Sequence, residues 1–165
     1  MITKTSLSAI RALMYLSRHE EDGPLSPRKI GEDLNESPTY MAKVTRHLVK
    51  AGILRAEKGV KGGVRLSRRP AEITMLEVVQ ACQGTLVGDY CQPDCDNASV
   101  CAYHRAAAEL HDAISGVLRR WTVAQLLKKP SAAGRKAGSI DCVILNGISP
   151  AIFSAGAVAT SMAEG

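Results

Sequence analysis

The dipeptide Ser-Pro, which occurs twice in close succession, is the feature that most constrains the fold of this chain. At Ser26-Pro27 and again at Ser37-Pro38, a serine suited to a helix N-cap precedes a proline suited to the first helical turn. The first dipeptide opens a short helix with Ile30 and Leu34 on one side, and the second opens a helix that runs to about Lys50. Two short helices in this succession are typical of a helix-turn-helix.

The segment after Lys50 has the pattern of a β-hairpin. Two short apolar stretches, residues 53–56 and 64–67, flank a tip that is rich in glycine and lysine. From Lys50 to Arg69 the chain carries seven basic residues and one acid, Glu57. Lysines on a glycine-rich tip can approach phosphates or a minor groove closely. The sequence therefore predicts a winged helix-turn-helix in a mainly α fold, with the hairpin as the wing.

The helix that begins at Ser37 has two different faces. Met41, Val44 and Leu48 recur at steps of three and four and form the face expected in the core. The other face carries hydrogen-bonding side chains at its start and cations along its length, which suits a helix in the DNA major groove. For this helix alone, a solvated face is the alternative. We predict DNA contacts from the helix-turn-helix and the wing at Arg28, Ser37, Thr39, Tyr40, Lys43, Arg46, His47, Lys58, Lys61 and Arg65.

Composition limits the class of protein. A net charge of +5 permits a polyanionic partner, and a hydrophobic content of 45% indicates a folded chain. Apolar runs stay well short of the roughly 20 residues that span a bilayer, so we expect no membrane association. The five cysteines are an odd number in a chain without an export signal, which predicts a cytoplasmic protein without structural disulfides.

Three cysteines and a histidine lie close together in the segment Cys91–His104. Cys91, Cys95, Cys101 and His104 have the spacing Cys-x3-Cys-x5-Cys-x2-His, with residues that favour turns between them. A loop of this kind can surround one centre, and thiolate with imidazole suits zinc or an iron–sulfur cluster. From the residues alone, both remain open. Cys82 lies before this loop, near the end of a helix that opens at Thr74, and is expected to be a small buried thiol.

After the cysteines, residues 101–129 have the pattern of one long helix of about 28 residues. Its apolar stripe includes Tyr103, Leu110, Ile114, Val117 and Trp121. A helix about 42 Å long exceeds what so small a domain can bury, so pairing with a second copy is expected. We divide the chain into a DNA-binding domain (1–70), a sensor and dimerisation segment (71–130), and a linker and tail (131–165) in which Cys142 has no assigned role.

These motifs together resemble the IscR, NsrR and RirA family of bacterial winged-helix regulators, which use iron–sulfur clusters as sensors. The resemblance covers roughly residues 1–129. It rests on Arg11-Ala-Leu in a helix expected over residues 5–19, Ser37-Pro-Thr-Tyr-Met at the start of the helix that opens at Ser37, Lys58-Gly-Val-Lys-Gly-Gly-Val-Arg-Leu in the wing, the cysteine loop, and Thr122-Val-Ala-Gln-Leu. It implies that Cys95, Cys101 and His104 match the last two cysteines and the histidine of the family pattern.

This chain departs from the family pattern in three places. Cys91 is three residues from Cys95, where the family has five. At the place of an aspartate ligand of the nitric-oxide-sensing branch stands Leu7 or Ser8, which favours His104 as fourth ligand and a 2Fe–2S over a 4Fe–4S cluster. Ala42 stands where IscR-like members carry glutamate, so their DNA sequence preference does not transfer.

The resulting prediction is a homodimeric regulator, a repressor and not an enzyme, that binds a pseudo-palindromic double-stranded DNA site. An iron–sulfur cluster that senses redox, iron or nitric oxide status would control it. Two alternatives differ in kind. The same four residues would hold a structural zinc in a DNA binder without a redox response. Without a metal, Cys91 and Cys95 would be the close pair of a disulfide switch.

Overall fold

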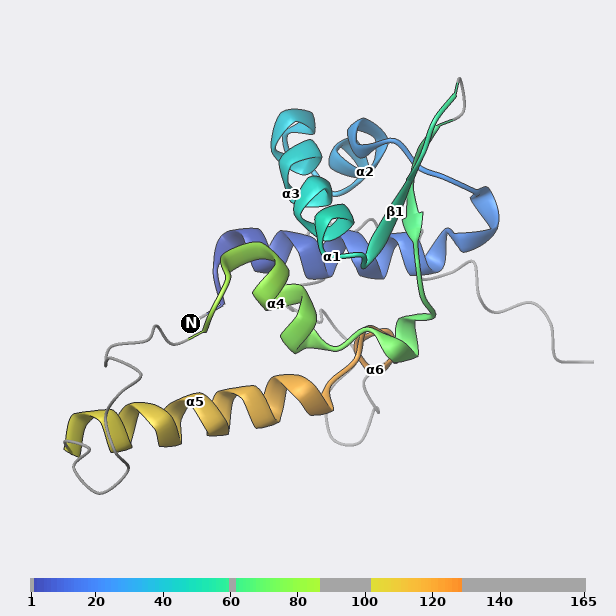
Figure 1. Ribbon diagram of the computed structural model, residues 1–165. Helices are drawn as coiled ribbons and strands as arrows, with labels where there is room; N and C mark the ends of the chain where they lie inside the picture. The colour runs from blue at the N-terminus through green and yellow to red at the C-terminus, as the bar shows by residue number, and fades with distance from the viewer. Residues whose placement is uncertain (1, 60–61, 87–101, 129–165) are drawn as a thin grey trace, which may run out of the picture.

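The computed structural model describes residues 2–59, 62–86 and 102–128, which form a mostly helical body with one two-stranded hairpin (Figure 1). This confirms the predicted mainly α fold class with a small β-hairpin. In chain order the elements are α1 (Lys4–Arg18), the 3-10 turn η1 (Glu20–Asp22), α2 (Pro27–Asp33), α3 (Pro38–Lys50), β1 (Leu54–Glu57), β2 (Gly63–Leu66), the 3-10 turn η2 (Pro70–Glu72), α4 (Met75–Gln83), α5 (Ala102–Arg120) and α6 (Val123–Leu126).

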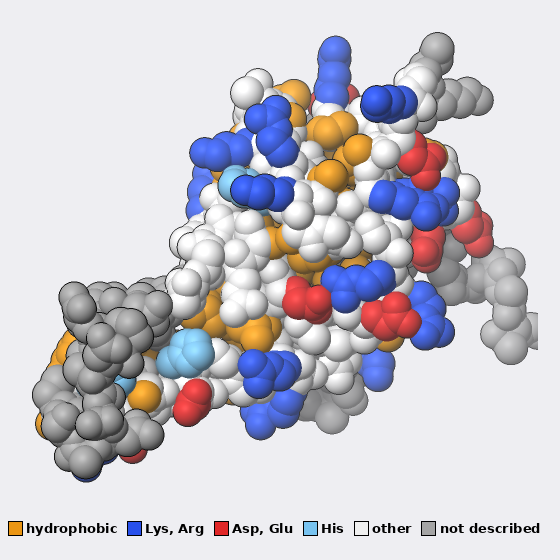
Figure 2. Space-filling view, viewed as in Figure 1, with side chains coloured by type: hydrophobic (Ala, Val, Ile, Leu, Met, Phe, Trp, Pro, Cys, Tyr) orange, Lys and Arg blue, Asp and Glu red, His pale blue; other side chains and the backbone are white. Residues whose placement is uncertain are grey.

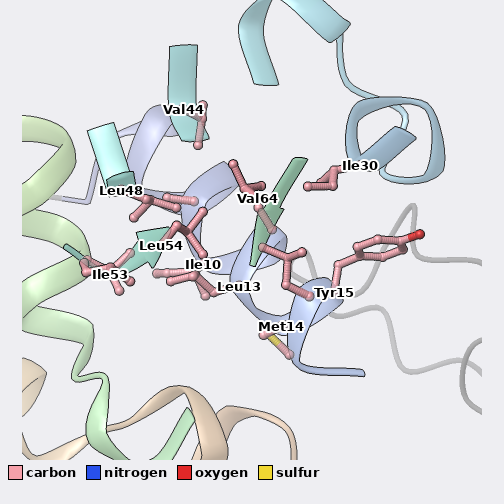
Figure 3. Close-up of a cluster of buried hydrophobic side chains, with 14 of the residues drawn as sticks. Ile10, Leu13, Met14, Tyr15, Ile30, Val44, Leu48, Ile53, Leu54 and Val64 are labelled. Carbon is pink, nitrogen blue, oxygen red and sulfur yellow. The ribbon is translucent and has the colours of Figure 1, made fainter. Parts of the chain in front are cut away.

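The core is built around α1, which lies between the helix-turn-helix and α4. Ile10 and Leu13 point from α1 toward Leu48 of α3 and toward Ile53 and Leu54 at the start of the hairpin (Figure 3). All five side chains are 2% exposed or less. Apolar side chains from a helix, a second helix and a strand therefore exclude water jointly, and this packing fixes where α3 and the hairpin stand on α1.

The predicted helix starts are confirmed by their caps. The Ser26 hydroxyl accepts a hydrogen bond from the Lys29 N–H at 3.2 Å, and the Ser37 hydroxyl accepts one from the Tyr40 N–H at 3.3 Å. Thr74 forms a complete capping box with Glu77 at the start of α4. Each serine or threonine satisfies a backbone donor that the first helical turn leaves without a partner, which is why these residues begin the helices.

The hairpin is antiparallel, with the register Leu54↔Leu66 and Arg55↔Arg65. The strands are shifted by one residue from the predicted ranges, because the paired residues run from Leu54↔Leu66 to Glu57↔Gly63. Leu25, from the segment before α2, forms an isolated bridge to Val64. A Cβ atom on the neighbouring Gly63 would meet the Leu25 backbone at 2.5 Å, so this close approach requires glycine.

The prediction of one unbroken helix over residues 101–129 is wrong. Helix α5 ends at Arg120, and Thr122 takes an extended conformation and caps the separate helix α6. The break is stabilised by pairing with the start of α4: the Met75 N–H donates to the Trp121 carbonyl at 2.8 Å, and the Val123 N–H donates to the Ile73 carbonyl at 3.0 Å. The apolar stripe continues across a turn that these bonds impose.

The division of the chain at residue 70 stays a prediction, and α4 packs against both α1 and α3 across that boundary. Residues 131–165, with Cys142, lie outside the described residues. Cys82, on the last turn of α4, is half-buried, and burial raises the pKa of its thiol to about 11. Cys82 was expected to be a small buried thiol, and in the structure it is only partly buried.

Candidate DNA-binding surface and metal loop

Helix α3 presents one face to the core and the other to solvent. Met41, Val44, Thr45 and Leu48 are buried, as expected from their spacing, and the Thr45 hydroxyl donates to the Met41 carbonyl at 3.0 Å. The remaining face is therefore turned outward. It carries the exposed side chains of Thr39, Lys43, Arg46 and Lys50 and the half-exposed imidazole of His47.

The turn before α3 is held by a largely buried ion pair from α1. The Arg11 guanidinium lies 3.3 Å from Oε1 of Glu36, and both side chains are at most 13% exposed. Arg11 also donates to the Leu34 carbonyl at 3.0 Å, and the Ser8 hydroxyl donates to Glu36 at 2.9 Å. Between these contacts Asn35 has a φ of 55°, a left-handed conformation that asparagine tolerates. The contacts fix the angle at which α3 leaves the helix-turn-helix.

The wing carries two arginines and one acid between them. Arg55 and Arg65 are directly opposite each other on β1 and β2. Glu57 Oε1 lies 3.5 Å from Arg55 Nε and 3.6 Å from Arg65 Nη1, so one carboxylate offsets part of both charges. Lys58 is exposed at the tip, and Lys61 lies outside the described residues.

Glycine is required at the tip of the wing. Gly59 has a φ of 122°, and a Cβ atom on Gly62 would lie 2.5 Å from the Glu57 carbonyl. The Gly62 N–H donates to the Gly59 carbonyl at 2.9 Å and closes the turn. Gly59 and Gly62 therefore allow a close backbone approach on either side of residues 60–61, and residues without a Cβ suit contact with a phosphate or a groove.

Lysine and arginine side chains gather over α3 and the wing, in the upper part of the face in Figure 2. Within the part of the chain that the structure describes, no ion pair joins Lys43, Arg46, Lys50 or Lys58 to an acid. Arg28 on α2 is different, because its Nε donates to Glu32 at 2.8 Å. A surface of uncompensated cations on a protruding helix and hairpin is suited to a polyanion with a groove.

Tyr40 is placed differently from its neighbours in the predicted DNA-contact set. It is half-buried, and its hydroxyl donates to Thr5 Oγ1 on α1 at 3.4 Å. The Lys4 ammonium lies 5.8 Å from the centre of its ring. Tyr40 therefore links the first turn of α1 to the first turn of α3.

Of the four predicted metal ligands, only His104 is among the described residues. Cys91, Cys95 and Cys101 lie outside them. His104 is half-buried on the first turn of α5. It is seven residues before His111 and fourteen before the buried Leu118, spacings that place all three on one side of an α-helix. Among the residues described here, no group of three His, Cys, Asp or Glu side chains has the arrangement of a metal site.

Helix α5 exposes an apolar stripe along its length. Tyr103, Leu110, Val117 and Trp121 are 46% to 65% exposed, at spacings of seven, seven and four residues. Beside the stripe lies an apolar groove of about 410 Å³, lined by Ile2, Leu86, Ala113, Ile114, Val117 and Leu118. Of the predicted stripe, Ile114 packs inward against Leu118, while Leu110, Val117 and Trp121 remain exposed among the described residues. Large exposed apolar side chains in such a row mark an interaction surface.

The sequence profile of the Rrf2 family, described as iron-dependent transcriptional regulators, matches residues 2–129. This range includes the helix-turn-helix, the wing, the cysteine loop and α5. The chain belongs to the Rrf2 family. As an Rrf2 protein it is a DNA-binding transcriptional regulator, and family membership places it among regulators and not enzymes.

The alignments with relatives cover most of the chain. The chain is 30% identical to the HTH-type transcriptional regulator YwgB of Bacillus subtilis over 125 residues, 73% of this chain and 80% of that protein. It is 27% identical to IscR of Photobacterium profundum, over 77% and 75% of the two chains. Among solved structures, IscR of T. potens aligns with a TM-score of 0.63 and 23% identity, over 84% and 93% of the chains, which supports the Rrf2 fold.

The sequence patterns did not predict the side chains that hold the candidate DNA-binding surface, α3 and the wing, in place. The Arg11–Glu36 pair joins residues 25 positions apart. A cation inside the apolar pattern of α1 was the available signal, since a largely buried charge requires a partner. Gln83, at the end of α4, accepts hydrogen bonds from the start of α1, and no pattern in the sequence indicates this. Within the described residues, no helix has both the length and the apolar character to cross a membrane.

Proposed function

We propose that this protein is a homodimeric repressor whose DNA binding is controlled by an iron–sulfur cluster, with 2Fe–2S favoured over 4Fe–4S. The observation that carries this proposal is the position of His104. It lies half-buried on the first turn of the helix that exposes the apolar stripe, three residues after the last of three closely spaced cysteines. A ligand at this point would connect the segment Cys91–His104, called the metal loop below, directly to α5, the proposed dimerisation helix.

The donor set fits such a cluster. Cys91, Cys95 and Cys101 supply thiolates, which are the usual ligands of iron–sulfur centres, and His104 supplies an imidazole. When bound, the cluster would supply a redox- and iron-sensitive centre. Because only the neutral ring of His104 binds metal, retention at this position would depend on pH. The names of relatives such as IscR support an iron–sulfur regulator without determining the cluster type.

For DNA, we propose that the outward face of α3 enters the major groove and that the wing contacts the backbone or the minor groove. Thr39, Lys43, Arg46 and His47 would reach base edges and phosphates from α3. Ser37, Arg28, Lys58, Lys61 and Arg65 would hold the phosphates around them, and Tyr40 would contact DNA at the edge of this surface.

We propose a second copy of the chain as the partner of the α5 stripe. If the two-fold axis is perpendicular to α5, the two copies of the helix would run antiparallel with their apolar stripes facing each other. Apolar contact along the stripe would favour this pairing. A dimer would present two α3 helices to a pseudo-palindromic site.

The test is to purify the protein without oxygen and to measure its visible spectrum with its iron, acid-labile sulfide and zinc contents. Visible charge-transfer bands with two irons and two sulfides per chain are expected. The variant Cys101→Ala should lose both iron and bands, while Cys82→Ala, the matched control outside the loop, should retain them. A Cys101→Ala protein that retains its iron would contradict the ligand assignment.

A structural zinc is the second candidate, because three thiolates and one imidazole also form a closed tetrahedral set. A colourless protein with about one zinc per chain would establish it. A metal-free protein whose DNA binding changes with a Cys91–Cys95 disulfide would instead favour a thiol switch. Both results would remove the iron–sulfur part of the proposal and leave the DNA-binding part unaffected.

A further inference from the structure

The last residue of α4 holds the first turn of α1. Gln83 Oε1 accepts hydrogen bonds from the Thr3 N–H at 3.1 Å and from the Ser6 hydroxyl at 2.9 Å. Thr3 is the N-cap of α1, and its hydroxyl accepts from the Ser6 N–H at 3.2 Å. Ser6 is fully buried. Without the Gln83 oxygen, its hydroxyl would keep only the Thr3 hydroxyl, 3.0 Å away, as a partner, so the contact with Gln83 helps to fix the start of α1.

The same first turn of α1 contacts the helix that carries the DNA-binding face. Thr5 accepts the hydrogen bond from the Tyr40 hydroxyl, and the Lys4 ammonium lies over the Tyr40 ring. Thr3 and Ser6 face α4, and Thr5 faces α3. A shift of this turn would therefore move the first turn of α3, where Thr39 and Tyr40 lie.

Gln83 is also the last residue of α4, so the chain leaves the helix there toward the metal loop. Gly84 follows it with a φ of 76° and ends the helix. Leu86 then joins Ile2 and the α5 side chains in the apolar groove. The residue that holds α1 is thus eight positions before Cys91, the first predicted ligand.

We propose that Gln83 is a positioning residue for DNA binding: it fixes the first turn of α1 and, through Thr5, the start of α3 and its Tyr40. The second part of the inference rests on the proposed function. A change in the metal loop reaches α3 through Gln83, because α4 and the loop meet there. The first part needs no cluster and is tested on apoprotein.

Three single variants of the full chain test the first part. Gln83→Leu removes the acceptor. Gln83→Glu keeps it, since a carboxylate accepts from both donors and is favoured at the N-terminus of α1. Gln80→Leu is the matched control, because Gln80 is an exposed glutamine one turn earlier on α4. The probe is a labelled duplex of about 30 base pairs, selected by the wild-type protein from a randomised pool.

Anisotropy titrations of apoprotein should show about three- to tenfold weaker binding for Gln83→Leu, and binding within about twofold of wild type for Gln83→Glu and Gln80→Leu. Circular dichroism melts show whether each variant is folded at the titration temperature. A purely structural role would lower the melting temperature of Gln83→Leu and leave its affinity unchanged. That result, or equal losses in Gln83→Leu and Gln83→Glu, would overturn the proposal.

A double-mutant cycle with Thr5→Val tests the route. If Gln83 acts through Thr5 and Tyr40, Gln83→Leu should cost less than about twofold in the Thr5→Val background. Additive losses would mean that Gln83 acts by another path. For the second part, the ratio of affinities between metal-loaded and apo protein should fall toward one in Gln83→Leu. A wild-type ratio already near one would contradict the proposed function, while the apoprotein cycle would still decide the role of Gln83.

Discussion

Replacing Glu57 by glutamine should tighten DNA binding, because this carboxylate competes with phosphate for the two arginines of the wing. Its Oε1 lies 3.5 Å from Arg55 and 3.6 Å from Arg65. All three side chains are 36% to 55% exposed, so these ion pairs are solvated and contribute about 0–1 kcal/mol each. DNA binding must weaken them before both arginines can contact phosphates. The variant avoids that cost without changing the size of the side chain.

The expected gain is up to about 1 kcal/mol, which corresponds to about two- to fivefold tighter binding at low salt. If one more phosphate is neutralised, the plot of log affinity against log salt should steepen by about 0.9. The advantage should therefore shrink as salt rises. Anisotropy titrations across a salt series with one fixed duplex give both quantities.

The matched control is Glu109→Gln, which makes the same change in net charge on α5, at the far side of the body from α3 and the wing in Figure 1. It should leave the slope unchanged. Equal tightening in both variants would mean that only net charge matters. A Glu57→Gln protein with the affinity and slope of wild type would refute the reasoning and place the wing arginines outside the interface.

Three further outcomes are expected. Leu110→Asp should weaken dimerisation at least a hundredfold, since each copy would lose about 1.5–3 kcal/mol of apolar burial, and a dimer in sedimentation at low protein concentration would contradict the assigned interface. Burial opposes ionisation of Glu77, but hydrogen bonds from Thr74 and Arg68 outweigh it and lower its pKa, so the carboxylate stabilises the fold above pH 4.5 and that stability is lost as pH falls. Glu77→Gln should thus be about 1 kcal/mol less stable at pH 7 in urea unfolding, and the deficit should vanish near pH 3. In a variant with serine at the other four cysteines, mass spectrometry should show the rate of Cys82 alkylation rising about tenfold per pH unit up to pH 10, because burial raises the pKa of its thiol to about 11. A rate that levels off near pH 9 would indicate an exposed thiol.

Local chemistry made much of the fold predictable. Ser26, Ser37 and Thr74 each cap a helix because the preference of a short hydroxyl side chain for that position depends only on neighbouring residues. The core face of α3 followed from its periodicity, and the glycines of the tip marked the hairpin. These features need no knowledge of distant parts of the chain.

Features that depend on distant partners were not predictable. Thr122 and Gln125 form a capping box, so a local signal for a helix start was present. The apolar stripe runs through it, and periodicity alone favoured one helix. The deciding interactions are the hydrogen bonds to Ile73 and Met75, which lie some fifty residues earlier in the chain. Gln83 and Arg11 are similar cases, because the partners that give these side chains their roles are set by the packing of α1.

The break after α5 also distinguishes two routes by which the metal loop would reach the DNA-binding face. Through α5, a change at His104 would travel along about 25 Å of helix to the bridge between Thr74 and Thr122. Through Gln83, it would cross two hydrogen bonds to the start of α1 and one contact to α3. The proposed dimer surface on α5 lies along the first route. Gln83→Leu should therefore reduce the response of DNA binding to the metal while the protein remains a dimer, and loss of the dimer in that variant would show that the two routes are not separate.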